Sequence, residues 1–428
     1  MTRGLVIAAP SSGSGKTVVT LALLAALLRR GVNVASAKAG PDYIDPRFHE
    51  HATHRPCVNL DPWAMRPALV EALAARGRCD LLVVEGVMGL FDGASGGAGS
   101  TADLAALLKL PVVLVIDVAR QAQSAAALVE GFARHRADVT VAGVILNRVA
   151  GEKHRRLIEA ALERSGVPVL GAVPREEALA LPSRHLGLVQ AGEHGALPAF
   201  IERAAGIIAA HVDLDALMQR AAPLATARTA RPLPPLGQRI AVASDEAFAF
   251  AYPHLVEGWR AQHAEVIAFS PLADEAPDTA ADAVYLPGGY PELHAGRIAG
   301  NGRFQSGLRA AAMRGALVYG ECGGFMVMGR TLIDAEGAAH PMADLLPVET
   351  SFAKRRMHLG YRRLTHDGAL PWPERLRGHE FHHSTLVSSG AGAPLFAASD
   401  AAGEQLAPMG LRLGCVMGSY AHVIDAED

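Results

Sequence analysis

A glycine-rich loop near the N-terminus carries the first residues that could do chemistry. An apolar run at residues 5–9 leads into residues 10–17, which read Pro-Ser-Ser-Gly-Ser-Gly-Lys-Thr, and an Ala/Leu-rich stretch follows. Glycines in such a turn let successive backbone N–H groups face one anion, and the N-terminus of the following helix adds partial positive charge. The segment therefore predicts a phosphate-binding loop for ATP, in which the lysine reaches the β- and γ-phosphates. The residues expected to bind ATP in this loop are Gly13, Ser14, Gly15, Lys16 and Thr17.

Two acidic segments supply candidate ligands for the Mg²⁺ that accompanies ATP. Residues 38–46 (Lys-Ala-Gly-Pro-Asp-Tyr-Ile-Asp-Pro) and residues 85–93 (Glu-Gly-Val-Met-Gly-Leu-Phe-Asp-Gly) each follow a predicted strand. Ligands collect at the carboxyl ends of parallel strands, and Mg²⁺ prefers oxygen ligands. We therefore expect Thr17, Asp45 and Glu85 to bind the metal.

Four further polar residues are expected around this nucleotide site. Asp42, Tyr43 and Asp92 would lie behind the metal ligands or on the substrate side. Asp42 and Asp92 have a structural alternative, because a single acid after a strand is often a helix cap. Asn147 ends a predicted strand at 141–146 and is placed to hydrogen-bond the edge of the adenine, with a capping role as its alternative.

The second set of chemical residues surrounds Cys322. Residues 319–325 (Tyr-Gly-Glu-Cys-Gly-Gly-Phe) follow a predicted strand and precede a helical stretch. A nucleophile at a strand-to-helix turn is exposed at the sheet edge, and the flanking glycines leave room for a substrate. Because the cysteine lies at a helix N-terminus, we expect its thiol pKa to be lowered. The oxyanion formed during attack is expected to be bound by the backbone at Gly288, Gly289 and Gly323.

A cysteine nucleophile needs a base, and the chain has 18 histidines. His422, in the segment 418–423, is the expected base because of its position in chain order. The competing candidates belong to residues 378–384 (Gly-His-Glu-Phe-His-His-Ser), a spacing that is poor for a metal site. They are His379, His382 and His383.

The elements that must position these residues are those of an α/β fold. Apolar runs that do not alternate with polar residues lie at 5–8, 32–38, 81–84, 112–116 and 141–146. Such runs are typical of strands buried on both faces of a parallel sheet. The segments between them are long enough for crossover helices, so we predict a doubly wound sheet.

A second α/β series follows a proline-rich linker. Residues 223–238 contain four prolines without apolar periodicity, which indicates an extended linker. The predicted domains are therefore an ATP-binding domain at 1–222 and a domain with the cysteine nucleophile at 239–428. Strand-like runs of the second domain lie at 239–243, 266–269, 283–286 and 316–319.

Composition excludes several classes of protein. The chain has 428 residues, 50% of them hydrophobic, which is enough to form two or three domains with buried cores. Its net charge of −3 gives an electrostatic field that does not favour binding of nucleic acid. No apolar run is long enough to span a bilayer, and no signal-peptide pattern is present. Four scattered cysteines indicate neither a disulfide framework nor a zinc site. We expect a cytoplasmic protein that binds neither nucleic acid nor membranes; a homodimer is left open.

Six motifs in their order resemble the cobyrinate and hydrogenobyrinate a,c-diamide synthases of cobalamin biosynthesis over essentially the whole chain. The resemblance implies two doubly wound α/β domains: an N-terminal P-loop ATPase, similar to dethiobiotin synthetase, and a C-terminal class I glutamine amidotransferase. Ile424 departs from the general amidotransferase triad, in which a glutamate two residues after the histidine is usual, so slow or tightly gated glutaminase activity is expected. The six motifs are residues 9–17, 38–46, 85–93, 320–325, 378–384 and 419–422.

The resemblance also implies a reaction. The N-terminal domain would use ATP and Mg²⁺ to phosphorylate the a- and c-acetate carboxylates of a corrinoid, hydrogenobyrinate or cobyrinate. The C-terminal domain would release ammonia from L-glutamine through a Cys322 thioester. Basic residues at 354–356 and 362–363 would bind the carboxylates of the macrocycle, with a solvated basic face as the alternative.

Three other functions are weighed against this one. Cobyric acid synthase, which amidates four other side chains, is the nearest enzyme alternative. A partition-type ATPase is disfavoured because Ser11 stands where those proteins carry an extra lysine. An inactive scaffold with a dead glutaminase is the third.

Overall fold

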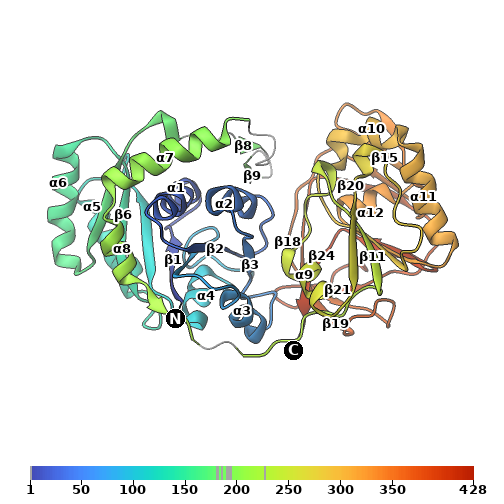
Figure 1. Ribbon diagram of the computed structural model, residues 1–428, viewed down its shortest axis with the longest axis horizontal. Coiled ribbons are helices and arrows are strands. Elements are labelled where there is room, and N and C mark those ends of the chain that lie inside the picture. Colours follow the sequence, from blue (N-terminus) through green and yellow to red (C-terminus); the bar gives the residue numbers. More distant parts are fainter. Residues whose placement is uncertain (1, 180–182, 185–186, 189–194, 226–227) are drawn as a thin grey trace. The chain divides into compact units, whose positions relative to one another are not determined.

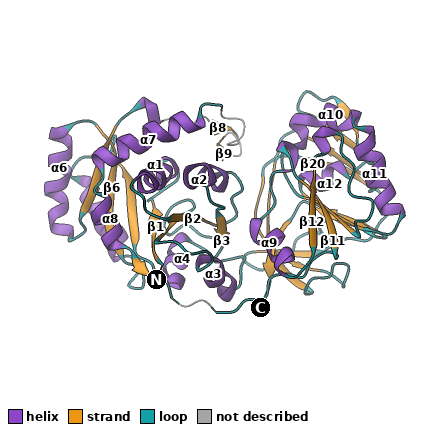
Figure 2. Cartoon of the chain, viewed as in Figure 1, coloured by secondary structure: helices purple, strands orange, loops and turns teal. Residues whose placement is uncertain are grey.

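The structure, a computed structural model, describes residues 2–179, 183–184, 187–188, 195–225 and 228–428. The chain forms two compact units, one from Met1–Trp63 and Pro67–Ala230, the other from Ala64–Arg66 and Arg231–Asp428. In each unit, strands form the centre and helices lie around them (Figure 1, Figure 2). The break after Ala230 falls inside the predicted linker, residues 223–238.

The first unit is built on an eight-stranded sheet with the order β3-β2-β4-β1-β5-β6-β7, and β10 pairs with the start of β1. Apart from β10, neighbouring strands are parallel, which confirms the predicted doubly wound fold. Five strands correspond to the five predicted runs, whereas β3, β7 and β10 have no counterpart in the prediction. The strands are β1 (Arg3–Ala8), β2 (Val34–Ala39), β3 (Val58–Leu60), β4 (Leu81–Glu85), β5 (Val112–Asp117), β6 (Val141–Val149), β7 (Val169–Pro174) and β10 (Ala222–Pro223), with a separate pair β8 (Ser183–Arg184) and β9 (Gly187–Leu188).

Helices cover both faces of this sheet, with α1 and α7 on one face and α3 and α4 on the other (Figure 1). Helix α1 is buried over most of its length because it packs between the sheet and α7. It ends where Gly31 takes a left-handed φ of 79°. The helices are α1 (Lys16–Arg29), α2 (Asp45–Thr53), α3 (Pro67–Ala74), α4 (Thr101–Leu108), α5 (Ser124–Arg134), α6 (Glu152–Leu162), α7 (Leu197–His211) and α8 (Leu214–Arg220), with short 3₁₀ turns η1 (Glu163–Ser165) and η2 (Glu177–Leu179).

The second unit contains a six-stranded sheet with the order β12-β11-β13-β14-β23-β22. Its neighbouring strands are parallel except for β22, and its first four strands are those predicted after residue 239. The strands are β11 (Arg239–Ala243), β12 (Glu265–Phe269), β13 (Ala283–Leu286), β14 (Leu317–Glu321), β22 (Leu411–Leu413) and β23 (Val416–Ser419). The helical segments are η4 (Glu246–Phe248), α9 (Pro253–Ala261), η5 (Pro271–Ala273), η6 (Pro291–His294), α10 (Ala295–Gly300), α11 (Gly302–Met313) and α12 (Gly323–Val327).

Two smaller four-stranded sheets complete this unit, and the sequence did not predict them. Their orders are β16-β15-β17-β20 and β21-β18-β19-β24. The second matters for the site because β24 comes directly after β23 and pairs with β19, so the motifs at 378–384 and 419–422 become neighbours. The strands are β15 (Thr331–Ile333), β16 (Ala339–Pro341), β17 (Val348–Ser351), β18 (His358–Thr365), β19 (Arg375–His382), β20 (Thr385–Ser389), β21 (Ala397–Asp400) and β24 (His422–Ala426).

A short segment from the N-terminal half, Ala64–Arg66, belongs to the second unit. The backbone N–H, Nε and Nη2 of Arg66 donate to the carboxylate of Asp425, each at 2.9 Å. Because the Asp425 side chain is fully buried, this arginine compensates a charge that is costly to bury alone.

Within the described ranges, every helix is too short or too polar to serve as a membrane span.

Candidate functional site

The predicted phosphate loop connects β1 to α1. Gly15 takes a left-handed φ of 88° and is followed at once by α1, whose first N–H groups face the loop. A Cβ at Gly15 would lie 2.2 Å from Nδ2 of Asn147, so a larger residue does not fit there. The same Nδ2 donates to the carbonyl of Ser14 at 2.9 Å. Asn147 therefore shapes the loop, and its contact with adenine stays a prediction.

A cavity of about 890 Å³ lies beside this loop. Its size suits a ligand as large as a nucleotide. Three arginines reach it from the ends of β5, β6 and β7, and sequence reasoning did not identify them. One of them, Arg148, pairs with Asp117 and donates to the carbonyl of Gly13 at 3.3 Å. The lining comprises residues 10–14 together with Ile116, Asp117, Ala119, Arg120, Gln121, Leu128, Arg148 and Arg175.

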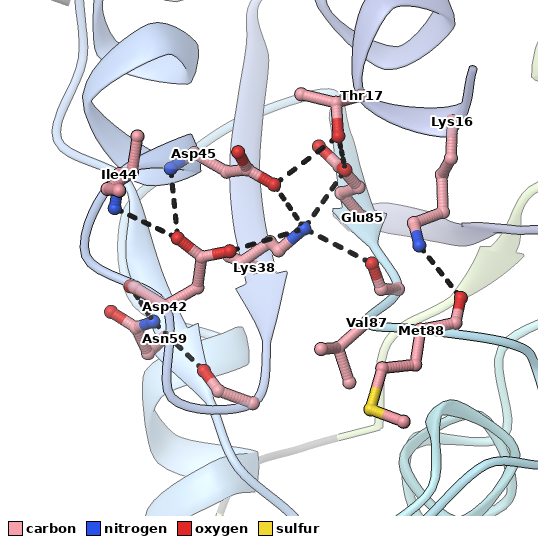
Figure 3. A network of polar contacts seen from close by, with 12 residues as sticks. Lys16, Thr17, Lys38, Asp42, Ile44, Asp45, Asn59, Glu85, Val87 and Met88 are labelled. Carbon is pink, nitrogen blue, oxygen red and sulfur yellow. Dashed lines mark hydrogen bonds and ion pairs between the residues drawn. The ribbon is translucent and has the colours of Figure 1, made fainter. Parts of the chain in front are cut away.

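Lys38 lies at the centre of the predicted metal site (Figure 3). Its Nζ is 2.6 Å from Asp45 Oδ2 and 3.0 Å from Glu85 Oε1. The hydroxyl of Thr17 donates to the same Glu85 oxygen at 2.6 Å and lies 3.3 Å from Asp45 Oδ2. The three residues predicted to bind Mg²⁺ thus come together around one cation, the ammonium group of a lysine that sequence reasoning had not singled out.

The donor set of this site fits a hard divalent cation. One hydroxyl and two carboxylates converge from the start of α1, the start of α2 and the end of β4. Oxygen donors of this kind are what Mg²⁺ prefers beside nucleotide phosphates. The second lysine, Lys16, donates to the carbonyl of Met88 at 3.0 Å, and burial together with Lys38 lowers its pKa to about 8.

Burial and charge together set the pKa values in this site. Burial opposes the charge on Lys38, but Asp45 and Glu85 outweigh it and hold the lysine pKa above its usual value. Burial would raise the pKa of Glu85, yet the Lys38 ammonium holds it below the usual range. The pKa of Asp45 is raised to about 7 by burial and by Asp42. A bound metal cation would oppose both effects and lower the pKa of Asp45.

His49 is a further residue of this site that sequence reasoning missed. Its Nε2 lies 2.6 Å from Glu85 Oε2, and both side chains are fully buried. On its other side, Nδ1 lies 3.5 Å from the sulfur of Cys57. His49 lies four residues after Asp45 on α2, one helical turn along the same face. This spacing is the sequence feature from which its position near the metal site could have been predicted. His49 holds Oε2 of Glu85 in place, whereas Oε1 of the same carboxylate contacts Lys38.

Asp42 and Asp92 both accept hydrogen bonds from nearby backbone N–H groups, although neither is the N-cap residue of a helix. Asp42 Oδ1 accepts from the backbone N–H groups of Ile44 and Asp45 at 2.9 and 3.0 Å, and Asp42 also lies 3.8 Å from Lys38 Nζ. Asp92 Oδ2 accepts from the N–H of Gly89 at 2.8 Å. Tyr43 is half-buried next to Asp42. A substrate contact for these three residues stays a prediction.

Cys322 occupies the turn between β14 and α12. Its φ of 46° and ψ of −104° are strained for a residue with a side chain, as expected of a nucleophile elbow. The turn is held by its own N–H, which donates to the carbonyl of Ser419 at 2.8 Å. A Cβ at Gly324 would lie 1.9 Å from the carbonyl oxygen of Leu286, so the helix approaches β13 as closely as glycine permits.

Cys322 and His422 meet at Gly288. A Cβ built on Gly288 would lie 3.3 Å from Cβ of Cys322 and 3.2 Å from Nε2 of His422. A Cβ on Gly323 would lie 3.1 Å from the backbone N of Gly289, so the three glycines predicted to bind the oxyanion surround the same spot. Which N–H groups bind an oxyanion stays a prediction.

The expected lowering of the thiol pKa is wrong. Burial raises the pKa of the Cys322 thiol, and the carboxylates of Glu292, Glu380 and Glu321 act in the same direction. Helix α12 has five residues, so its dipole is short and does not offset the desolvation. A buried His422, whose pKa is lowered well below its usual value mainly by burial, supplies no positive charge either. The thiol therefore stays protonated until a base removes its proton.

Of the competing histidines, His379 lies next to His422. His379 pairs with His422 across β19 and β24, and their rings stack with centroids 5.0 Å apart. His379 Nδ1 lies 3.3 Å from the hydroxyl of Tyr252. The ring of His382 stacks on Tyr420 at 3.8 Å. His379 and His382 thus belong to a wall of rings with His422 and Tyr420, whereas His383 contacts the ring of Phe381.

Glu380, in the same motif, joins this wall through two ion pairs. Its Oε1 lies 2.8 Å from His382 Nε2, and its Oε2 accepts from Nη2 of Arg362 at 2.7 Å. His358 brings a third possible metal ligand within 4.8 Å. These three ligand atoms lie close enough together to hold a metal ion, whereas the spacing within residues 378–384 predicts a poor metal site.

The basic residues proposed to bind substrate carboxylates divide into two groups. Arg362 is engaged with Glu380, and Arg363 pairs with Glu427. The side chains at 354–356 are exposed. Residues 362–363 are thus held in ion pairs within the unit and do not form a solvated basic face, and substrate binding by 354–356 and 362–363 stays a prediction.

Comparison with known proteins gives matches over both units. Residues 5–189 match the family described as the CobQ/CobB/MinD/ParA nucleotide binding domain, and residues 239–428 match the CobB/CobQ-like glutamine amidotransferase domain. A Brucella suis protein named hydrogenobyrinate a,c-diamide synthase is 59% identical over 430 residues, covering 99% of this chain and 98% of the relative. Proteins of the same name from Rhizobium meliloti and Rhodobacter capsulatus are 56% and 53% identical, with 99% of this chain and 100% and 98% of the relatives covered.

Proposed function

The chain belongs to the family of hydrogenobyrinate a,c-diamide synthases and is an amidating ligase with a glutamine amidotransferase domain; we propose that it converts the a- and c-acetate carboxylates of hydrogenobyrinate into amides. The resemblance, fold class and enzyme class predicted from the motifs are thereby confirmed. The observation that carries the proposal is the presence, in one chain, of a phosphate loop beside converging carboxylates and of an elbow cysteine beside an imidazole. Metal-free hydrogenobyrinate is proposed over cobyrinate because the relatives carry its name.

The first unit activates the carboxylate. An oxygen of the substrate carboxylate attacks the γ-phosphorus of ATP, the bond to the β-phosphate oxygen breaks, and ADP leaves as the acyl phosphate forms. Lys16 and Lys38 bring two ammonium groups to this edge of the sheet, where they stabilise the charge on the transferred phosphoryl group. Thr17, Asp45 and Glu85 would hold Mg²⁺, which when bound neutralises part of the phosphate charge.

The second unit releases ammonia. His422 takes the proton from the sulfur of Cys322, and the thiolate attacks the side-chain carbonyl carbon of glutamine. Backbone N–H groups at Gly288, Gly289 and Gly323 bind the oxyanion. His422 returns the proton to the leaving nitrogen, ammonia departs, and water hydrolyses the thioester to glutamate. Ammonia then attacks the acyl phosphate, phosphate leaves, and an amide remains.

The test is amidation by the full chain with ATP, Mg²⁺ and glutamine, followed by mass spectrometry of the corrinoid. With hydrogenobyrinate we expect a product carrying two amides, and with cobyrinate a much slower reaction. Four amides, or amides on other side chains, would place the chain with cobyric acid synthase. No amide from either corrinoid would overturn the proposal.

A further inference from the structure

The second unit lacks the acid that normally orients a catalytic histidine. In the general amidotransferase triad a glutamate stands two residues after the histidine, and this chain has the apolar, fully buried Ile424 there. A base of this kind works best when a carboxylate fixes its tautomer and balances the imidazolium that forms during proton transfer. A carboxylate from another part of the fold would satisfy the same requirement.

Glu321 lies in the required place. It is the last residue of β14, directly before Cys322, and its side chain is fully buried. Its Oε2 lies 3.8 Å from Nδ1 of His422, the ring nitrogen opposite the Nε2 that lies next to Gly288. Imidazole contacts of this length in an unliganded site commonly shorten when substrate binds.

Neutral hydrogen-bond donors hold Glu321 from three strands. The hydroxyl of Tyr285 on β13 donates to Oε2 at 2.8 Å, and that of Tyr319 on β14 donates to Oε1 at 3.0 Å. The backbone N–H of Val423 on β24 donates to Oε1 at 3.0 Å. Tyr285 and Tyr319 are register partners with stacked rings, so the carboxylate is held rigidly. These neutral donors fix the position of the Glu321 carboxylate but do not neutralise its negative charge, which a nearby cation can balance.

We propose that Glu321 is the positioning residue for His422 and takes the place of the missing triad acid. When His422 accepts the proton of Cys322, the imidazolium gains the Glu321 carboxylate as its counter-ion across the 3.8 Å gap. When the proton passes to the leaving nitrogen, that charge disappears again, so the carboxylate carries no proton in the net reaction. The inference rests on the proposed function, since it assigns a partner to the base of that same glutaminase site.

Glu380, another carboxylate near Cys322, is already engaged. Glu380 is paired with His382 and with Arg362. A carboxylate that balances an arginine has less to offer to a transient imidazolium. Glu321 contacts phenols and an amide instead, and burial raises its pKa to about 7, as expected for an acid without a permanent cationic partner.

The experiment compares Glu321→Gln with wild type in the full chain, using glutamine or ammonium chloride as the nitrogen source. Glutamine keeps the size of the side chain and one accepting oxygen but removes the charge. We expect kcat with glutamine to fall by roughly 10²- to 10⁴-fold, with KM for glutamine little changed. The rate with ammonium should stay within about twofold of wild type, because Glu321 touches neither ATP nor the corrinoid. Glu321→Asp should recover part of the loss, since it restores the charge.

Two controls separate the possible failures. Asp425→Asn removes another buried carboxylate of the same unit, and its ratio of glutamine to ammonium rates should remain that of wild type. Cys322→Ala tests the proposed function itself: retention of its glutamine-dependent rate would overturn that function. If Cys322→Ala loses its glutamine-dependent rate but Glu321→Gln keeps the wild-type glutamine-dependent rate, only the positioning role of Glu321 is overturned. Equal loss with both nitrogen sources in Glu321→Gln and Glu321→Asp would also overturn it, because it would mean that Glu321 is structural.

Discussion

Glu85 and Glu321 are both fully buried carboxylates at the carboxyl end of a parallel strand, but the charges around them differ. Glu85 contacts the ammonium of Lys38 and the imidazole of His49. Glu321 accepts hydrogen bonds from two phenols and one amide. Burial acts on both, yet Lys38 holds the pKa of Glu85 below its usual range, whereas the pKa of Glu321 is raised to about 7. The difference follows from the partners, because Glu85 has a permanent cationic partner in Lys38, whereas Glu321 is held by neutral donors.

The largest expected effect separates the two units chemically. Cys322→Ala removes the nucleophile, so glutamine-dependent amidation should fall by more than about 10³-fold while ammonium-dependent amidation survives. The measurement is the rate of amide formation with each nitrogen source, followed by mass spectrometry. A parallel loss of both rates would mean that the elbow cysteine serves the structure of the unit and not its chemistry.

Glu85→Gln should affect both nitrogen sources. It removes the charge that Lys38, Thr17 and the proposed metal share, so amidation with glutamine or ammonium should fall by roughly 10²- to 10³-fold. Glutamine hydrolysis measured alone should change far less. Glu159→Gln on the surface of α6 is the matched control and should leave every rate intact. Normal rates with ammonium in Glu85→Gln would contradict the assignment of the ATP site.

The pH dependence of stability should have opposite signs in Glu321→Gln and Glu85→Gln. The folded pKa of Glu321 is raised from 4.5 to about 7, so the folded state keeps a proton that the unfolded chain loses, and wild-type stability falls as pH rises through this window. Glu321→Gln removes that penalty, so its free energy of unfolding relative to wild type should rise between about pH 4.5 and about pH 7.

Glu85→Gln should instead be less stable than wild type at neutral pH. A lowered folded pKa contributes stability above the unfolded value of 4.5 and loses it as pH falls. Denaturant unfolding at about pH 5 and about pH 8 measures both variants. The same sign of change in both would remove the contrast drawn between the two carboxylates.

The smallest expected effect concerns the phosphate loop. Asn147→Ala removes the hydrogen bond to the carbonyl of Ser14, worth about 1 kcal/mol, and loosens the loop. KM for ATP should rise about three- to tenfold, with glutaminase activity unchanged. Asn147→Asp keeps the size but loses the donor, so an unaltered KM in both variants would show that the amide does not order the loop.

The fold and the local motifs could be predicted because their signals lie in neighbouring residues. The phosphate loop at 10–17 and the elbow at 319–325 are contiguous, and buried parallel strands leave apolar runs that can be read directly. The sheet β16-β15-β17-β20 was missed because β15, β16 and β20 are short and partly exposed, without a clear apolar run. Helix α1 occupies the Ala/Leu-rich stretch that follows the phosphate loop.

The remaining site residues were missed because their partners are distant in sequence. Lys38 and Glu85 are 47 residues apart, and Glu321 is joined to Val423 across 102 residues. The thiol pKa was wrong because a helix N-terminus can be recognised in sequence, whereas the burial that outweighs it cannot. Glu321 itself was within the elbow motif, but its partners become visible only when β13, β14 and β24 are assembled.

The pairing of Arg66 with Asp425 has a consequence for any attempt to produce the amidotransferase half alone. A protein cut at the break after Ala230 would begin at Arg231 and leave Arg66 behind on the other piece. Asp425 would then be an uncompensated charge in the interior, a loss that typically costs about 3–5 kcal/mol. Such a fragment should express poorly or aggregate, and Asp425→Asn in the fragment should recover part of its solubility.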